Sequence, residues 1–340
     1  MKIAVIGAGG WGTALAAVLG ENDHQVALWA RSAAFAAELA ATRRNRRYLP
    51  DAVLPAGALC TADLAAAAEG AAIVIIATPS HAVRATAAAL APQLADGAVV
   101  VSAAKGLEVG TLKRMTEVIA EEIPAAAARL VALSGPNHAE EVALRHPTAT
   151  VAASFSRPAA ETVQEALMAP YFRVYTNPDN IGVELGGALK NIIALGAGIG
   201  DGLGFGDNAK AALMTRGLAE ITRLGVAMGA RPLTFAGLSG IGDLIVTCTS
   251  RHSRNRRAGL ALAAGKTVGE IEGETGMVVE GIRSTLAAYE LATRLGVEMP
   301  ITAEIHRVLY QGADPREAVG RLMGRGRTHE VEEVAEIENW

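Results

Sequence analysis

The stretch KIAVIGAGGWGTAL at residues 2–15 decides the fold of this chain. Residues 3–6 form the short apolar run that is typical of a buried parallel strand, and a helical pattern follows the glycines. Gly7, Gly9 and Gly12 stand between them at G-x-G-x-x-G spacing. The first allows a tight turn, the second lets a pyrophosphate approach the backbone, and the third lets the helix pack closely on the strand. The stretch therefore predicts a dinucleotide-binding turn, in preference to a strand–helix turn that binds nothing.

Further apolar runs follow at intervals that indicate strands alternating with helices. The expected strands are residues 25–29, 71–77, 99–104, 130–134, 148–155 and 171–176. Beyond them the pattern is helical almost throughout. We therefore expect an α/β fold, in which a Rossmann-type, doubly wound and mostly parallel sheet precedes an all-α region. The expected domains are a dinucleotide-binding domain at residues 1–178 and a helical substrate and catalytic domain at residues 179–340.

The composition narrows the class of protein. A formal net charge of -4 gives no general attraction to nucleic acid, so no nucleic-acid partner is expected. The cysteines, Cys60 and Cys248, form no CxxC motif, which suits a reducing cytoplasm. The N-terminus lacks a signal-peptide pattern, and no uninterrupted apolar run reaches about 18 residues, so no membrane span is expected. The histidines lack metal-ligand spacing, and no metal is expected.

Arg31 lies where the ribose-recognising residue of a dinucleotide-binding unit stands, about 20 residues past the glycine turn. A guanidinium there suits a 2′-phosphate, which favours NADP or tolerance of both cofactors, unless Arg31 is an ordinary solvated side chain. The basic run at 43–47 ends in Tyr48. It is either a solvated face or a wall for the adenosine end of the cofactor.

Two loops after predicted strands carry candidate ligand-binding residues. Lys105 stands at the carboxyl end of a strand, which points it toward the crevice of a doubly wound sheet, although a surface lysine is the alternative. Gly135 and Asn137 belong to a sharp turn after the strand at 130–134, and its free backbone amides could serve an anionic ligand.

Lys190 lies in a predicted helix at 184–198 that contains far more glycine than helix propensity favours. Gly186 and Ala194, at i−4 and i+4, strip bulk from the face around its amine. A desolvated lysine has a lowered pKa and can act as a general acid or base. The sequence supports equally well a helix that packs tightly through its glycines while Lys190 reaches solvent.

Two further groups of polar residues follow in the helical half. Asp243 lies in an apolar, glycine-rich setting, where it either orients a catalytic lysine or caps a helix. Ser253, Arg254 and Asn255 together offer the hydroxyl, guanidinium fork and amide that a small phosphate needs, with a solvated basic stretch as the alternative.

Taken together, these motifs resemble the bacterial NAD(P)-dependent sn-glycerol-3-phosphate dehydrogenases over nearly the whole chain. The motifs that carry the resemblance are GAGGWGTALA (7–16), SAAKGLE (102–108), SGPNHAEE (134–141), LGGALKNIIALGAGI (185–199), GIGDLIVTCTSRHSRNRRAG (240–259) and VVEGIRS (278–284). The Lys-Asn and Ser-Arg-Asn motifs are much more specific than the glycine turn.

The resemblance implies reduction of dihydroxyacetone phosphate to sn-glycerol 3-phosphate, which enters phospholipid synthesis. It implies that Lys190 donates the proton and that Asp243 lies beside it. Substrate contacts would come from Lys105, Gly135, Asn137, Lys190, Asp243, Ser253, Arg254 and Asn255. Asn137 departs from the hydroxyl residue of many relatives. Besides the three glycines and Tyr48, the nucleotide contacts would come from Gly10, Trp11, Arg31, Lys105, Ala139, Arg254, Val278 and Glu280.

Two other readings of the sequence stay open. A related two-domain hydroxy-acid dehydrogenase could use the Ser-Arg-Asn cluster for a carboxylate. A non-catalytic NADP-sensing regulator would keep the glycine turn but would have no reason to hold Lys190, Asp243 and Arg254 together. The expected cofactor is NADP or NAD, with NADPH preferred. The expected substrate is a small phosphorylated three-carbon compound, and a homodimer is expected by analogy with helical domains of other dehydrogenases.

Overall fold

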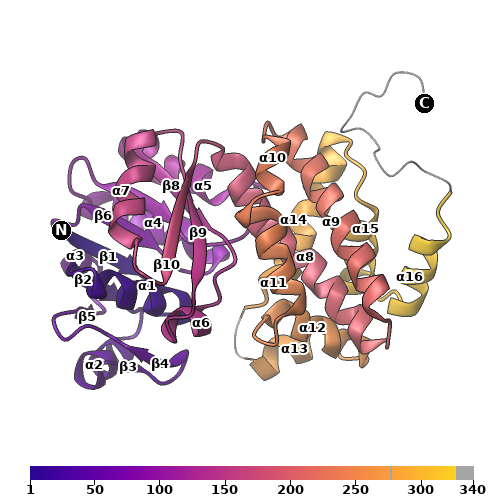
Figure 1. Cartoon of the computed structure of the whole chain (residues 1–340), viewed down its shortest axis with the longest axis horizontal. Helices are drawn as coiled ribbons and strands as arrows, with labels where there is room; N and C mark the ends of the chain where they lie inside the picture. The colour runs from indigo at the N-terminus through magenta and orange to yellow at the C-terminus, as the bar shows by residue number, and fades with distance from the viewer. Residues whose placement is uncertain (276–277, 327–340) are drawn as a thin grey trace.

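The structure is a computed structural model that describes residues 1–275 and 278–326. The N-terminal half contains a β-sheet with helices beside it, and the C-terminal half is helical (Figure 1). We call residues 1–178 the sheet region and residues 179–326 the helical region. The predicted α/β class, with an all-α second half, is confirmed.

The sheet region is built on an eight-stranded sheet in the order β10-β9-β8-β7-β6-β1-β2-β5. Neighbouring strands are parallel except β8 and β9, which are antiparallel, so the sheet is mostly parallel as predicted. The strands are β1 (Lys2–Ile6), β2 (Gln25–Trp29), β5 (Leu59–Thr61), β6 (Ile73–Ile76), β7 (Val99–Ser102), β8 (Leu130–Ser134), β9 (Thr148–Ala153) and β10 (Phe172–Asn177).

Each of the seven expected strands is present within a few residues of its predicted bounds. The sequence did not predict β5 or a separate two-stranded antiparallel sheet of β3 (Arg44–Asn45) and β4 (Leu49–Val53). These strands are short, and they contain arginine, proline, aspartate or cysteine in place of an apolar run. Sequence patterning gives little signal for such edge pieces because packing against neighbours decides them.

Both faces of the sheet are covered, which explains why its central strands are apolar without alternation. In β1, Ile3 and Val5 join the apolar cluster on one face, and Ala4 and Ile6 join the cluster on the other. The first cluster includes residues of α1 (Gly10–Glu21), α2 (Ala33–Thr42) and α7 (Arg157–Leu167), and the second includes α3 (Leu64–Ala68), α4 (Val83–Leu90) and α5 (Met115–Glu122).

The glycine turn between β1 and α1 is closely packed. Gly7 has a φ of 124°, and a Cβ built there would lie 2.8 Å from the Ala77 carbonyl oxygen. A Cβ on Gly12 would lie 1.9 Å from the Gly7 carbonyl oxygen. Only glycine fits at either position. Because β1 lies between β2 and β6, the turn opens at the switch point where doubly wound sheets bind ligands.

The helical region is arranged around α8, which runs from Asn180 to Gly202 with Asp179 as its N-cap. A Cβ on Gly198 would lie 2.0 Å from the Arg256 carbonyl oxygen, so α8 and α12 approach backbone to backbone. The other helices are α9 (Asp207–Ala227), α10 (Pro232–Phe235), α11 (Asp243–Thr249), α12 (Arg254–Ala263), α13 (Val268–Thr275), α14 (Glu280–Leu295), α15 (Pro300–Tyr310) and α16 (Pro315–Met323), with a π-helical turn η4 (Leu238–Gly242) before α11.

Two helical segments of the described chain are long and apolar enough to cross a membrane by length and composition alone. They are Asn180–Gly202 and Pro232–Thr249, and 89% of the tested window of the first is buried inside the protein. Burial of this kind is typical of the core helix of a globular protein, and Figure 1 shows α8 surrounded by other helices.

Candidate active site

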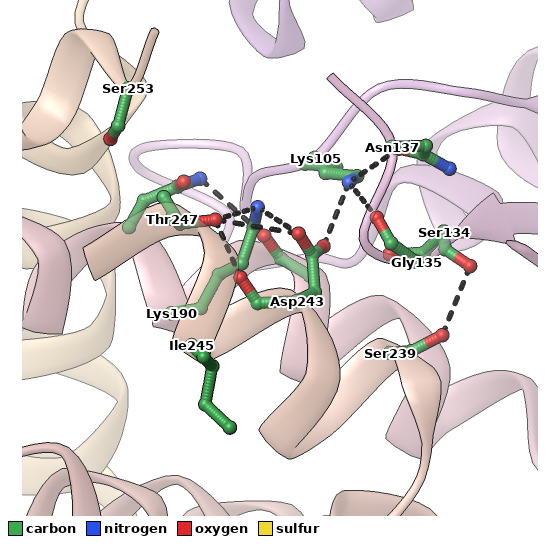
Figure 2. A network of polar contacts seen from close by, with 12 residues as sticks. Lys105, Ser134, Gly135, Asn137, Lys190, Ser239, Asp243, Ile245, Thr247 and Ser253 are labelled. Carbon is green, nitrogen blue, oxygen red and sulfur yellow. Dashed lines mark hydrogen bonds and ion pairs between the residues drawn. The ribbon is translucent and has the colours of Figure 1, made fainter. Parts of the chain in front are cut away.

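A polar cluster lies where the carboxyl edge of the sheet meets the helical region (Figure 2). The sheet region contributes Lys105 from the loop after β7, and Gly135 and Asn137 from the loop after β8. The helical region contributes Lys190 from the middle of α8 and Asp243 from the start of α11. The sequence predicted each of these residues for a site, and the fold brings them together from four separate segments.

Asp243 forms ion pairs with both lysines at once. Its Oδ1 accepts a hydrogen bond from Lys190 Nζ at 2.5 Å, and its Oδ2 accepts one from Lys105 Nζ at 2.8 Å. Asp243 and Lys190 are only 1% and 5% exposed. A single buried carboxylate therefore holds two ammonium groups side by side, one from each region of the molecule.

The remaining hydrogen bonds of the two lysines fix their positions further. Lys190 Nζ also donates to Thr247 Oγ1 at 2.7 Å, while Lys105 Nζ donates to the Gly135 carbonyl at 2.9 Å and to Asn137 Oδ1 at 3.2 Å. The Asn137 amide donates in turn to Thr150 Oγ1 at 2.8 Å, which orients its oxygen toward Lys105. Sequence analysis missed Thr247, although it lies one helical turn after Asp243.

Burial and charge shift the pKa values of Lys190 and Asp243 in the cluster. Burial lowers the pKa of Lys190 to about 8, with Lys105 acting in the same direction and Asp243 opposing it. Burial alone would raise the pKa of Asp243, but the charges of Lys105 and Lys190 outweigh it and hold that pKa below its usual value. Asp243 is therefore a carboxylate at neutral pH, and Lys190 loses its proton more readily than an ordinary lysine.

The structure separates the alternatives that the sequence left open for two residues. Lys190 does not reach solvent, even though α8 also packs closely through its glycines. A Cβ on Gly186 would lie 2.4 Å from the Ser239 carbonyl oxygen, so glycine at i−4 lets η4 approach α8. Asp243 is the first residue of α11 and follows its N-cap, Gly242. Its carboxylate is used by the lysines, not by the helix terminus.

The Ser253–Asn255 cluster forms the start of α12. Ser253 is the N-cap and accepts a hydrogen bond from the Arg256 backbone N–H at 3.2 Å. Arg254 is exposed and donates to the Val278 carbonyl at 3.2 Å. The Asn255 amide is buried, donating to Asn191 Oδ1 at 2.8 Å and accepting from the Gly281 backbone N–H at 2.9 Å. Asn255 therefore joins α12, α8 and α14, and Arg254 is the more accessible of the two.

The glycine turn fits a dinucleotide. Gly9, the N-cap of α1, provides no side chain to the first amides of the helix, and a Cβ there would meet nothing within 4 Å. Beside it, the buried indole Nε1 of Trp11 has no hydrogen-bond partner in the described structure. Open space over Gly9 and free amides at a helix N-terminus suit a pyrophosphate. The backbone of Gly10, the next residue, faces Ala139 and Tyr48, where a Cβ would lie 3.7 Å and 3.2 Å from them.

Two other predicted nucleotide contacts lie near the end of β2. Arg31 is exposed and immediately precedes Ser32, the N-cap of α2. Tyr48 is half-buried, and its ring packs edge-on against Phe35 at 5.8 Å between centroids. The Arg47 guanidinium lies 5.0 Å from the centre of the same ring. These residues place cationic and aromatic surface beside the switch point.

Glu280, the remaining predicted nucleotide contact, joins the two regions directly. Its carboxylate accepts hydrogen bonds from the Ser80 backbone N–H at 3.0 Å and from Ser80 Oγ at 2.6 Å. Ser80 follows β6 in the turn that starts at Thr78, and sequence analysis did not assign it to the site. Val278, whose carbonyl accepts a hydrogen bond from Arg254, lies two residues before Glu280. The segment 278–280 therefore contacts α12 through Val278 and the turn after β6 through Glu280.

Other chemistries find little support in the described residues. Within residues 1–275 and 278–326, no group of three or more His, Cys, Asp or Glu side chains could hold a metal ion. Cys248 is fully buried, and burial raises its pKa to about 12. A thiol of that kind is a poor nucleophile.

Comparisons with known proteins show the family to which the chain belongs. The family models for the N-terminus and the C-terminus of NAD-dependent glycerol-3-phosphate dehydrogenase match residues 2–160 and 179–320. A glycerol-3-phosphate dehydrogenase (NAD(P)+) of Desulfitobacterium hafniense (strain Y51) is 58% identical over 99% of this chain and 95% of its own length. One of Geobacillus kaustophilus (strain HTA426) is 56% identical over 99% of this chain and 98% of its own.

A solved structure gives the same result for the fold. The crystal structure of glycerol-3-phosphate dehydrogenase from Coxiella burnetii matches with a TM-score of 0.91 and 40% identity, over 95% of this chain and 99% of the other. The two family models together span both regions of the molecule, and the identities extend over almost the whole sequence. The chain therefore belongs to the family of NAD-dependent glycerol-3-phosphate dehydrogenases.

Proposed function

We propose that this protein catalyses the reversible reduction of dihydroxyacetone phosphate to sn-glycerol 3-phosphate with NADPH or NADH. The observation that carries the proposal is the buried carboxylate of Asp243 between the ammonium groups of Lys190 and Lys105. It lies at the carboxyl edge of a sheet whose glycine turn fits a dinucleotide. An NADP-sensing regulator would have no use for a buried ammonium group and a second, half-buried one that share a carboxylate.

Each residue of the cluster has a chemical task in this reaction. The bound cofactor supplies the hydride that reduces the carbonyl carbon. Lys190 stabilises the negative charge that grows on the carbonyl oxygen and gives it a proton, and in the reverse direction it accepts that proton. Asp243 orients Lys190 through Oδ1 and Lys105 through Oδ2. Lys105 and Asn137 hold the three-carbon part of the substrate, and Arg254 pairs with its phosphate.

The direct test is reduction of dihydroxyacetone phosphate by purified protein, followed as loss of NADPH absorbance and, separately, of NADH absorbance. We expect rapid oxidation of the cofactor with this substrate and far slower oxidation with unphosphorylated dihydroxyacetone. A 2-oxo acid that is reduced with the same efficiency as dihydroxyacetone phosphate would favour the alternative, a hydroxy-acid dehydrogenase. Cofactor binding without any oxidation would favour the regulator.

The glycine turn provides a matched pair of variants for the cofactor site. Gly12→Ala brings a Cβ against the Gly7 carbonyl, which we expect to cost about 3 kcal/mol of stability and to weaken NADPH binding. Gly9→Ala meets no protein atom, so it should leave the melting temperature unchanged while its methyl group hinders the pyrophosphate. Thermal unfolding and NADPH titration measure both effects. Equal loss of stability in the two variants would contradict the assigned roles.

Arg31 is expected to set the preference between the cofactors. Arg31→Ala should raise the KM for NADPH about 10- to 100-fold, because a charge-assisted contact to the 2′-phosphate is lost, while the KM for NADH changes little. Because Arg31 is exposed, the substitution should not alter stability. Arg157, an exposed residue of α7 that pairs with Glu161, is the control, and its replacement by alanine should leave both constants unchanged. Equal changes in the KM values for NADPH and NADH would show that Arg31 does not bind the 2′-phosphate.

The pKa of Lys190 near 8 predicts opposite pH profiles for the two directions. Reduction needs the ammonium form, so its kcat should be level below that pH and fall about tenfold per pH unit above it. Oxidation of glycerol 3-phosphate needs the neutral amine, so its kcat should rise with pH and level off above about 8. Rates measured in both directions across this range, with saturating substrates, test the assignment. Profiles with the same sign would exclude Lys190 as the proton-transfer group.

We further propose the division of the chain into domains at residues 178 and 179 and its assembly as a homodimer. The end of β10 at Asn177 and the N-cap of α8 at Asp179 support the division. Leu233 in α10 and Met323 in α16 are 86% and 82% exposed, and each is an apolar side chain that a partner would cover. Light scattering of the purified protein should give twice the mass of one chain. The free thiols Cys60 and Cys248 support the cytoplasm as its location.

A further inference from the structure

One buried polar atom beside the lysine cluster has no task in the reaction described above. His138 follows Asn137 in the loop after β8 and precedes the short helix α6 (Ala139–Ala143). Its Nε2 atom is buried, and it has no hydrogen-bond partner in the described structure. A buried donor or acceptor without a partner is costly, so an atom of this kind at the edge of an active site indicates a missing ligand group.

Burial and the charges around His138 affect the pKa of its imidazole. Burial lowers the pKa of His138, Lys190 and Lys105 lower it further, and Glu140 and Asp243 oppose them. The group is therefore the neutral imidazole at neutral pH, with one nitrogen that donates and one that accepts. His138 thus lies close enough to both lysines for their charges to affect its imidazole.

Another neighbour of His138 belongs to the helical region. Its ring faces that of His252, with 6.2 Å between centroids and 50° between planes. His252 immediately precedes Ser253, the N-cap of α12, and Arg254, which has been assigned here to the substrate phosphate. His138 is therefore a neighbour both of the lysine cluster and of the segment before α12, to which the proposed function assigns the substrate phosphate.

We propose that His138 is a substrate-binding residue whose Nε2–H donates a hydrogen bond to the phosphate group of the bound three-carbon substrate. The assignment rests on the proposed function. The carbonyl oxygen must lie against Lys190 to receive its proton, which directs the phosphate, at the other end of the substrate, toward α12 and His252. A neutral imidazole N–H suits an anionic oxygen there, since it adds a donor without adding a third buried positive charge beside Lys105 and Lys190.

The matched variants are His138→Phe, which keeps a ring of similar volume without a donor, and His138→Gln, which keeps an N–H near the position of Nε2. For His138→Phe we expect the KM for dihydroxyacetone phosphate to rise about tenfold and kcat to change less than about threefold. The dissociation constant of inorganic phosphate, titrated into the complex of protein and NADPH, should rise in parallel. His138→Gln should restore most of both losses, and neither variant should alter NADPH binding.

Other outcomes would overturn the proposal. An unchanged KM and an unchanged phosphate affinity in His138→Phe would show that Nε2 meets no phosphate. A raised KM with unchanged phosphate affinity would move the contact to the three-carbon part of the substrate. Equal losses in the phenylalanine and glutamine variants would indicate a packing role. Because phosphate binding is measured without turnover, it tests His138 even if the wild-type protein does not reduce dihydroxyacetone phosphate.

Discussion

Replacing Lys190 with alanine is expected to lower kcat for reduction of dihydroxyacetone phosphate by about 10³- to 10⁴-fold, the range for loss of a positioned acid that also stabilises an oxyanion. The side chain is 5% exposed, and its only described partners are Asp243 and Thr247. Asp243 keeps its ion pair with Lys105 in the variant, so no unpaired carboxylate is left. The loss should therefore appear in kcat, with NADPH affinity unchanged.

Steady-state kinetics and NADPH titration of the same preparation check this expectation. Lys113→Ala is the matched control, because Lys113 is a half-exposed lysine whose ion pair with Glu121 lies on the surface. It should retain full activity. Partial recovery of the Lys190→Ala rate by added methylamine would show that the missing group is an amine. A Lys190→Ala variant with wild-type kcat would show that Lys190 is not the proton donor.

Asp243→Asn is expected to reduce both stability and activity. The amide has the same size but no charge, so Lys105 and Lys190 lose the one carboxylate that they share while both remain buried or half-buried. Removing one partner from a buried ion pair costs about 3–5 kcal/mol. Here we expect about 3 kcal/mol in urea unfolding, because Lys190 relieves part of the penalty by losing its proton.

The same substitution should move the pH profile. Without the carboxylate, the pKa of Lys190 falls further, because burial and Lys105 lower it and the largest contribution that raises it came from Asp243. The fall in the rate of reduction should then begin at a lower pH than in the wild type. Asp201→Asn is the control. Asp201 also lies on α8, but its ion pairs are with Lys210 of α9 and Arg256 of α12, and neither lysine of the cluster is its partner. It should keep the wild-type pH profile. An unshifted profile in Asp243→Asn would contradict the coupling.

These predictions rest on residues that sequence analysis singled out, but the sequence left the environment of each open. The apolar run at 3–6 and the spacing of Gly7, Gly9 and Gly12 were enough to predict the first strand, the turn and the helix. They are local signals, since strand burial, a positive φ and close helix packing act within a few residues of the chain. The edge strands β3, β4 and β5 lack such signals and were not predicted.

The alternatives for Lys190 show where sequence reasoning stops. Glycine at i−4 was equally compatible with a ligand cavity and with tight helix packing, and in the structure Gly186 serves packing while Lys190 is buried beside Asp243. Which of these occurs depends on a residue 53 positions away. The same holds for Ser80 and Glu280, which are 200 positions apart and meet between the two regions.

The sequence alone predicted seven strands of the sheet, the glycine turn and the set of residues from which a site could be built. Only the tertiary structure decided that Lys105, Lys190 and Asp243 form one cluster, that Asn255 is held by Asn191 and Gly281, and that the Nε2 atom of His138 is buried without a partner. The physical reason is that helix and strand patterns depend on neighbours in the chain. Burial, ion pairing and the resulting pKa values depend on which segments the fold brings together.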